Sequence, residues 1–261
     1  MTTEEAALRE AVAAAMESCE ASSGGAHVRE LTFEGHAVRV REVSLGHGVG
    51  AKLWKAAVML SWELVRNPSW CEGRRTLEIG AGVGLCGLLA ARLGATRVVL
   101  TDFEHPLLDS LCAAVEDNGL GGVAEVAKLD WIREAEEAAA AAEQESGRRA
   151  SENENDASSA SATGRGWGTL GSGETFDFVF GSDLLYERTH AEVLPAVVKR
   201  RLAPGGRCRI VGAVRDRALL DALQANVRAV GLEVFEHHLD DNHGDDWYED
   251  GYAALEITHA S

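Results

Sequence analysis

The stretch Thr76-Leu77-Glu78-Ile79-Gly80-Ala81-Gly82-Val83-Gly84-Leu85 decides the fold of this chain. Its first four residues predict a short buried strand, and a helix is expected to begin at Leu85 with no spacer. The three glycines at alternate positions allow positive φ angles, and they let a ligand lie directly against the main chain. The stretch therefore predicts a strand, a glycine-rich loop and a helix, with a binding site at the loop.

An acidic residue follows at the distance that a nucleoside site requires. A second strand, 96–101, is expected to end on Asp102, which lies 18 residues after Gly84. At the tip of the second strand of a βαβ unit, a carboxylate can accept hydrogen bonds from both hydroxyls of a ribose. Together with the glycine loop, Asp102 predicts a cofactor that contains adenosine.

Two classes of cofactor fit the glycine loop. Gly82-x-Gly84-x-x-Gly87 also matches the dinucleotide fingerprint, which is weak evidence alone. Glu78 precedes the first glycine, where its carboxylate would repel a pyrophosphate but favour the ammonium and sulfonium of S-adenosylmethionine (SAM). We therefore expect SAM, bound by Glu78, Gly80, Gly82, Gly84 and Asp102. A glycine-rich turn that binds nothing is the alternative.

The rest of the chain predicts an α/β fold. Alternating residues around Glu34-Gly35-His36 indicate a β-hairpin, 28–33 and 37–43, and apolar spacing predicts a helix over 52–66. Strands and helices then alternate, which predicts a Rossmann-like, mainly parallel sheet with helices on both faces. The last two strands have no helix between them, so one antiparallel edge strand is expected. The seven expected strands of this sheet are 76–79, 96–101, 123–129, 176–181, 207–213, 232–239 and 252–258.

Length and composition predict one domain with an insertion. A chain of 261 residues with 46% apolar content can bury a single core. We expect an acidic extension over 1–27 and the domain over 28–261. The segment from about 134 to 173 is rich in Ala, Glu, Ser and Gly, so a disordered insertion is expected there. Its first part, 134–145, could form a solvated helix. A substrate-recognition loop is the functional alternative.

Charge and cysteine usage bound the function. The net charge of −17 argues against a nucleic-acid partner and suits a basic protein surface. The five cysteines lack any C-x-x-C spacing, which predicts reduced thiols and no metal site. No apolar run is long enough for a membrane span, and because the Ala/Glu-rich residues 1–20 have no basic region before an apolar one, we expect them to be neither a secretory signal nor a transit peptide. We expect a monomer in the cytoplasm or the nucleus.

Two further pairs of residues follow predicted strands. Asp130-Trp131 ends the third strand, where a carboxylate can accept from an adenine amine and an indole can pack beside the base. The alternative interpretation is that Asp130 caps a turn and Trp131 belongs to the core. Ser182 and Asp183-x-x-Tyr186 end the fourth strand, at the edge where open α/β sheets bind ligands. A carboxylate and a phenol are therefore expected to face the methyl donor.

These residues carry a resemblance to a known family. From about Gly46 to Ile257, excluding the insertion, the chain resembles the seven-β-strand SAM-dependent methyltransferases, and within them the lysine-methyltransferase-like group called methyltransferase family 16. The motifs that carry the resemblance are Leu53-Trp54-Lys55-Ala56-Ala57, Leu77 to Gly87, Val98 to Asp102, Leu129-Asp130-Trp131 and Asp183-Leu184-Leu185-Tyr186. Lys55, where the family often has proline, and the long insertion depart from the pattern.

The resemblance implies methylation of a lysine on a non-histone protein such as a chaperone or an elongation factor. It implies that Trp54 walls the cofactor site, that Asp183 holds and orients the incoming amine, and that Tyr186 narrows the pocket. The amine must be neutral to attack the sulfonium methyl, and positioning is expected to supply most of the acceleration. A catalytically silent SAM-fold module that binds a partner protein is the alternative. Methylation of arginine, histidine or a small molecule is a third possibility.

Overall fold

The computed structural model describes residues 27–43, 49–148, 166–239 and 251–260. The expected extension over 1–27 lies outside them except for His27. The described chain begins with a hairpin of β1 (His27–Phe33) and β2 (His36–Glu42), as predicted. Its turn residues Glu34 and Gly35 both have positive φ, 47° and 87°, which matches the twist of a two-residue hairpin.

The main sheet has the predicted Rossmann-like arrangement, with β6-β5-β4-β3-β7-β8-β10-β9 as its strand order. All neighbouring pairs from β6 to β8 are parallel. The strands are β3 (Arg75–Ile79), β4 (Arg97–Asp102), β5 (Ala124–Lys128), β6 (Gly168–Thr169), β7 (Phe176–Ser182), β8 (Leu202–Ala213), β9 (Leu232–Leu239) and β10 (Tyr252–His259).

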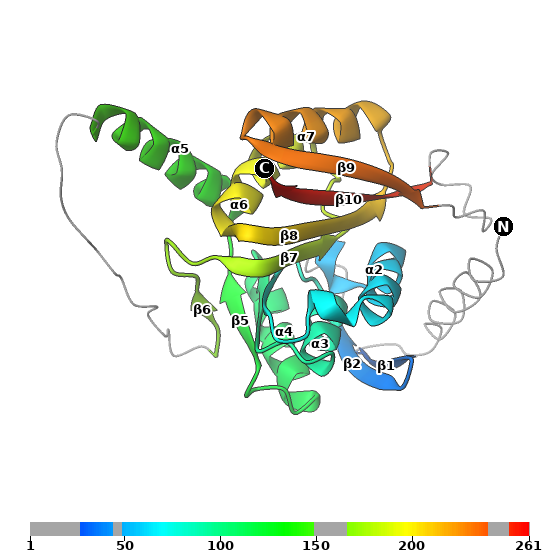
Figure 1. The fold of residues 1–261 in the computed structure, drawn as a ribbon. Coiled ribbons are helices and arrows are strands. Elements are labelled where there is room, and N and C mark those ends of the chain that lie inside the picture. The colour runs from blue at the N-terminus through cyan, green and yellow to red at the C-terminus, as the bar shows by residue number, and fades with distance from the viewer. Residues whose placement is uncertain (1–26, 44–48, 149–165, 240–250, 261) are drawn as a thin grey trace.

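Helices cover both faces of this sheet, and Figure 1 shows the two groups on opposite sides. The first group, packed with the hairpin, is α2 (Lys55–Arg66), α3 (Leu85–Arg92) and α4 (His105–Asp117), and the second is α5 (Trp131–Arg148), α6 (Arg188–Arg201) and α7 (Arg217–Ala229). Strand residues alternate between the two cores. Val98 and Leu100 pack with the first group, whereas Val99 packs with the second. Because helices cover both faces, the residues on both sides of each buried strand are mainly apolar.

The sheet differs from the prediction in two ways. It has eight strands and not seven, because the short β6 pairs with Ala127 and Lys128 of β5. The antiparallel strand is β10, which lies one position in from the edge, between β8 and β9. After β8 the chain passes through α7 and places β9 two strand positions away from β8. β10 then fills the position between β8 and β9 and pairs with both.

Both ends of the segment expected to be disordered, 134–173, carry structure. Helix α5 begins at Trp131 and extends to Arg148, and the Arg201 guanidinium binds the buried Glu134 carboxylate at 2.6 and 2.9 Å. At the other end Trp167 is buried, and its indole N–H donates to Asp109 at 2.9 Å. Composition missed these contacts because a few anchoring side chains fix the ends of an otherwise polar segment.

Candidate functional site

The site lies where parallel strands end. The chain leaves β3 toward β4 on one side and returns to β7 on the other, so the strand order reverses between β3 and β7. Ligands bind at such a switch point, outside the carboxyl ends of the strands. A pocket of about 630 Å³ opens there. This volume lies within the range of small-molecule and cofactor sites.

Most of the predicted site residues line this pocket. The loops after β3, β4, β5 and β7 each contribute side chains or backbone. The predicted residues that line it are Trp54, Gly80, Gly82, Asp102, Asp130, Trp131, Ser182, Asp183 and Tyr186. The predicted residues Glu78 and Gly84 are not among the lining residues. The sequence motifs, spread over much of the chain, are thus brought to one place.

The glycine loop has the predicted backbone conformation. Gly80, Gly82 and Gly84 have φ angles of 64°, 54° and 80°, which L side chains rarely adopt. A Cβ at Gly80 would also lie 2.7 Å from Leu184 and 3.0 Å from Trp131. The loop is therefore held closely under the side chains that line the pocket, and its main chain is left accessible at Gly80 and Gly82.

Asp102 fastens this loop from the neighbouring strand. Its carboxylate accepts hydrogen bonds from the backbone N–H groups of Gly82 at 2.9 Å and of Phe103 at 2.7 Å. Burial raises the pKa of the Asp102 carboxyl above its usual value, opposed by these hydrogen bonds. Asp102 also lines the pocket, so it can present lone pairs to ribose hydroxyls while it holds the loop.

Asp130 combines the two positions considered for it, one that faces the pocket and one that caps a helix. Asp130 lines the pocket, and one carboxylate oxygen accepts from the N–H groups of Ile132 and Arg133 at 3.1 and 3.2 Å. It therefore caps the start of α5. Trp131 packs over Gly80 and meets the His190 ring edge-on, with ring centroids 5.2 Å apart.

Exposed apolar side chains gather at the pocket. The large hydrophobic residues that are exposed in the described part of the chain include Trp54, Phe103, Ile132 and Tyr186, and all four line it. Exposed apolar groups that cluster around a cavity mark a ligand or partner site. Phe103 and Ile132, together with Leu129, provide apolar surface on which a flat base can pack.

Glu78 and Gly84 have other surroundings. The Glu78 side chain is buried behind the loop, where it accepts a hydrogen bond from the Gly87 N–H at 2.8 Å. Gly84 is the residue before α3, and a Cβ there would meet Leu111 at 2.6 Å and Leu100 at 2.9 Å. In this structure the packing of α3 accounts for both residues.

Asp183 and Tyr186 come from the loop after β7 and line the same pocket. Asp183 has a φ of 56° and its carboxylate receives two hydrogen bonds from the Arg215 guanidinium. Tyr186 is half-exposed, and its ring meets His190 edge-on at 4.3 Å. Burial raises the pKa of the Tyr186 phenol, and Asp102 and Glu187 add to that shift.

The pocket residues that were not predicted from the sequence include Lys52, His190 and Arg215. Lys52 directly precedes Leu53, whose N–H donates to the buried Glu42 at 2.9 Å, and this contact ties the segment before α2 to the hairpin. His190 lies in the first turn of α6, and Tyr186 precedes that helix, so helical spacing did not point to it. No short-range pattern pointed to Arg215.

The donor set fits SAM. Asp102 can bind the ribose, the second oxygen of Asp130 can accept from the adenine amine, and Lys52 can meet the carboxylate of the amino-acid end. The lining carboxylates of Asp102, Glu104, Asp130, Asp183 and Glu187 outnumber the cations Lys52 and Arg215. That balance favours a cationic cofactor over a pyrophosphate. Among the described residues, no group of acidic, histidine or cysteine side chains could hold a metal ion.

Solved structures share this fold. A putative SAM-dependent methyltransferase from Streptococcus mutans aligns with a TM-score of 0.57 at 11% identity, over 91% of this chain and 57% of that one. The 16S rRNA N2 G1207 methyltransferase of T. thermophilus, solved with AdoMet and guanosine, aligns with a TM-score of 0.56 at 17% identity, over 91% and 52%. The chain therefore has the Rossmann-like methyltransferase fold.

Sequence relatives narrow the class. Residues 32–145 match the model of the family described as lysine methyltransferase. The protein N-lysine methyltransferase METTL21A of Danio rerio is 39% identical over 105 residues, 39% of this chain and 47% of the relative. The protein N-terminal and lysine N-methyltransferase efm7 of Neurospora crassa is 48% identical over 54 residues, 21% and 19%. The chain spans less than half of either relative's length.

Proposed function

We propose that the chain is a SAM-dependent protein-lysine N-methyltransferase. The observation that carries the proposal is that Asp102, at the end of β4, and Asp183 with Tyr186, after β7, line a single pocket at the switch point of the sheet. The match of residues 32–145 to the lysine methyltransferase family supports the same function. A cofactor bound at one end and an acceptor at the other would then meet inside one cavity.

The chain's own groups would hold the cofactor as follows. Asp102 binds the ribose hydroxyls, and Phe103 and Ile132 enclose the adenine beside Asp130. Lys52 lies among the lining residues near the glycine loop and meets the carboxylate of the amino-acid end. Trp54, which is 39% exposed at the mouth, restricts access of water to the cofactor.

SAM, when bound, supplies a methyl group carried on a sulfonium. The acceptor lysine enters beside Trp54 and Tyr186, whose rings shield its apolar stem. Asp183 orients the amine, and the proton of the ammonium is lost to water before attack. Holding the amine in line with the methyl group supplies most of the acceleration, because proximity and orientation are worth several kcal/mol.

The partner and the location belong to the same proposal. With a net charge of −17, the chain suits a monomeric enzyme that acts on a basic protein surface and not on nucleic acid. The described cysteines Cys71, Cys86, Cys112 and Cys208 are free, as in the reducing cytosol or nucleus. In the described parts of the chain, no helix is both long and apolar enough to cross a membrane.

Incubation of the protein with a cell extract and methyl-labelled SAM tests the function. We expect label on a lysine of a discrete protein, identified by mass spectrometry, and loss of that label with Asp102→Ala. Label on arginine, histidine or a small molecule would reassign the acceptor. Binding of SAM by calorimetry with no label in any extract would favour a silent module that binds a partner.

A further inference from the structure

Asp183 does not present a bare carboxylate to the pocket. The Arg215 guanidinium donates one hydrogen bond to each carboxylate oxygen, both at 2.6 Å. The Asp183 side chain is 9% exposed and that of Arg215 is 25% exposed. Such a two-pronged, charge-assisted contact is among the strongest polar pairings in proteins, and its planar geometry is specific to arginine.

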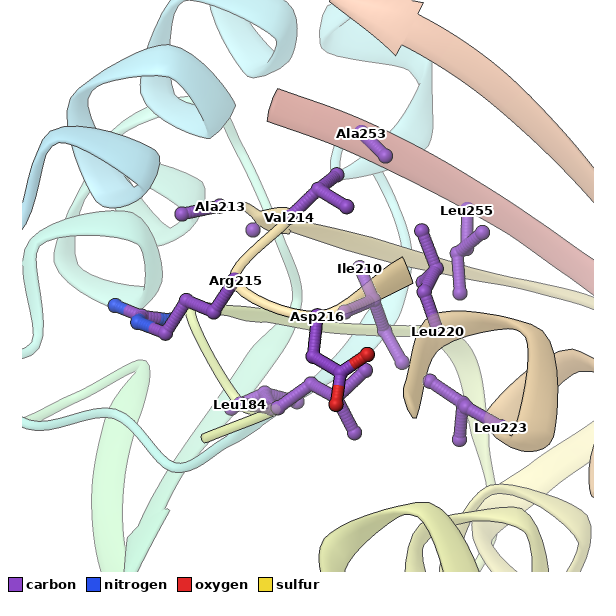
Figure 2. Close-up of a pocket in the computed structure, with 12 residues that line it drawn as sticks. Leu184, Ile210, Ala213, Val214, Arg215, Asp216, Leu220, Leu223, Ala253 and Leu255 are labelled. Atoms are coloured by element: carbon purple, nitrogen blue, oxygen red, sulfur yellow. The ribbon is translucent and has the colours of Figure 1, made fainter. Parts of the chain in front are cut away.

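Both partners of this pair are fixed by the backbone. Asp183 adopts a left-handed φ of 56°, and its N–H donates to Val211 of β8 at 2.8 Å. Arg215 lies in the turn between β8 and α7. Figure 2 shows its side chain pointing away from that of Asp216. Asp216 instead caps α7 by accepting from the Ala218 N–H at 2.9 Å.

A small cavity lies next to the pair. It has a volume of about 20 Å³ and is lined by Leu184, Leu220, Leu223, Arg215 and Asp216, among others. Arg215 also lines the large pocket, so it lies between the two cavities. The pair is therefore built into the junction of β7, β8 and α7.

The surrounding charges make the pairing matter for chemistry. Besides Asp183, Arg215 and Tyr186, the titratable or charged groups that line the pocket are Lys52, Asp102, Glu104, Asp130, Glu187 and His190. Burial lowers the pKa of the His190 ring and raises that of the Tyr186 phenol, so both are uncharged near neutral pH. Carboxylates thus dominate the wall, and they stabilise the ammonium form of an incoming lysine, which cannot attack.

We propose that Arg215 is a positioning residue of the acceptor site, which cancels the charge of Asp183 while leaving it able to accept a hydrogen bond. Asp183 can then orient the acceptor amine without holding it in the charged, unreactive form. This inference rests on the proposed function. It assigns to Arg215 an effect on the protonation of the acceptor, which a purely structural salt bridge would not have.

The test is the pH dependence of methyl transfer to the lysine substrate, measured from about pH 6.5 to about pH 11 for wild type, Arg215→Gln and Arg215→Lys, so that the range includes the ordinary lysine pKa of about 10.4. Loss of a cation beside the bound amine raises the pKa of that amine, so the rising limb of kcat, which reports the enzyme–substrate complex, should move up by about one pH unit in Arg215→Gln. At pH 7.5 this shift lowers kcat about ten-fold, and the deficit narrows only as the pH rises past the ordinary lysine pKa of about 10.4. Arg215→Lys keeps the charge and should stay close to the wild-type profile.

Arg217→Gln is the matched control, because Arg217 pairs with Glu236 and Asp221 and is not among the residues that line the pocket. Thermal unfolding and SAM calorimetry on each variant separate loss of fold or cofactor from the effect sought. A loss in Arg215→Gln that is equal at every pH, or an unchanged profile, would overturn the inference while the proposed function stands. Absence of lysine methylation by wild type would overturn the proposed function, and the inference with it.

Discussion

The Glu78 carboxylate and the backbone N–H of Gly87 are joined by a hydrogen bond of 2.8 Å that spans the glycine loop from behind. Glu78 lies on β3 and Gly87 in the first turn of α3, so the bond ties the strand to the helix across the turn that separates them. A Cβ at Gly87 would lie 2.5 Å from the carboxylate oxygen, which leaves glycine as the residue that fits. The loop conformation therefore depends on a buried acid as well as on its own glycines.

The buried position of Glu78 predicts a pH-dependent stability. Burial raises the pKa of its carboxyl to about 8, whereas the unfolded chain has an ordinary value of about 4.3. Between these values the folded state binds more protons than the unfolded state. This group therefore lowers the free energy of unfolding by about 1.4 kcal/mol for each pH unit of increase.

Glu78→Gln keeps an oxygen for the Gly87 N–H but cannot ionise. The free energy of unfolding of wild type minus that of Glu78→Gln, measured with urea from pH 5 to pH 8, should fall steadily as the pH rises. The subtraction removes all other titrating groups. A difference that does not change with pH would show that Glu78 is ionised in the folded protein.

A second prediction concerns Asp102 and cofactor affinity. Asp102→Asn keeps an oxygen for the Gly82 N–H but loses the charge that faces the pocket. Hydrogen bonds to charged groups contribute about 1.5–3 kcal/mol, so SAM should bind roughly ten-fold or more weakly, as measured by calorimetry. Asp221→Asn, on the outer side of α7 and paired with Arg217, is the control and should bind as wild type does. Equal affinities for Asp102→Asn and wild type would remove Asp102 from the cofactor site.

The Glu134–Arg201 pair predicts that the start of α5 is part of the stable core. Both side chains are buried, and removal of one partner leaves an unpaired charge, so Glu134→Leu should cost about 3–5 kcal/mol. The double variant Glu134→Leu with Arg201→Met should lose clearly less than the sum of the two single variants. Denaturant unfolding of all four proteins gives the coupling. Additive losses below about 1 kcal/mol would mean that α5 contributes little to the stability of the domain.

Two tryptophans should separate stability from binding. Trp167 is 8% exposed and Trp54 is 39% exposed at the pocket. Trp167→Ala should cost about 3–5 kcal/mol, because it removes a buried ring and the partner of Asp109. Trp54→Ala should leave the melting temperature near wild type and weaken SAM binding. If Trp54→Ala lowered the melting temperature and left SAM binding unchanged, the pocket would not be where the cofactor binds.

The sequence predicted the parts of the site that depend on neighbouring residues. The glycine loop and Asp102 follow strands directly, and the carboxyl ends of parallel strands must meet at one edge, so their convergence could be foreseen. Arg215 could not be foreseen, because it meets Asp183 across 32 positions and only after β7 and β8 have paired. The direction of the Glu78 side chain likewise depends on how α3 packs on the sheet.

The same distinction holds for the fold. Periodicity gave the helices and strands, with small differences at their ends, but it did not give the place of β10. That place depends on which edge each crossover reaches, which is a property of the assembled sheet. Composition predicted disorder over 134–173, and it could not show that Glu134 meets Arg201 across 67 positions.

The place of β10 has a consequence for how the protein is made. β10 pairs along its length with both β8 and β9, yet the ribosome synthesises it after both of them. Until residues 252–259 emerge, β8 and β9 are each without the strand that joins them, and the nascent sheet presents open edges to other chains. The edges of β8 and β9 therefore stay open until the last strand has joined them, and in that interval the chain is prone to aggregate and dependent on chaperones.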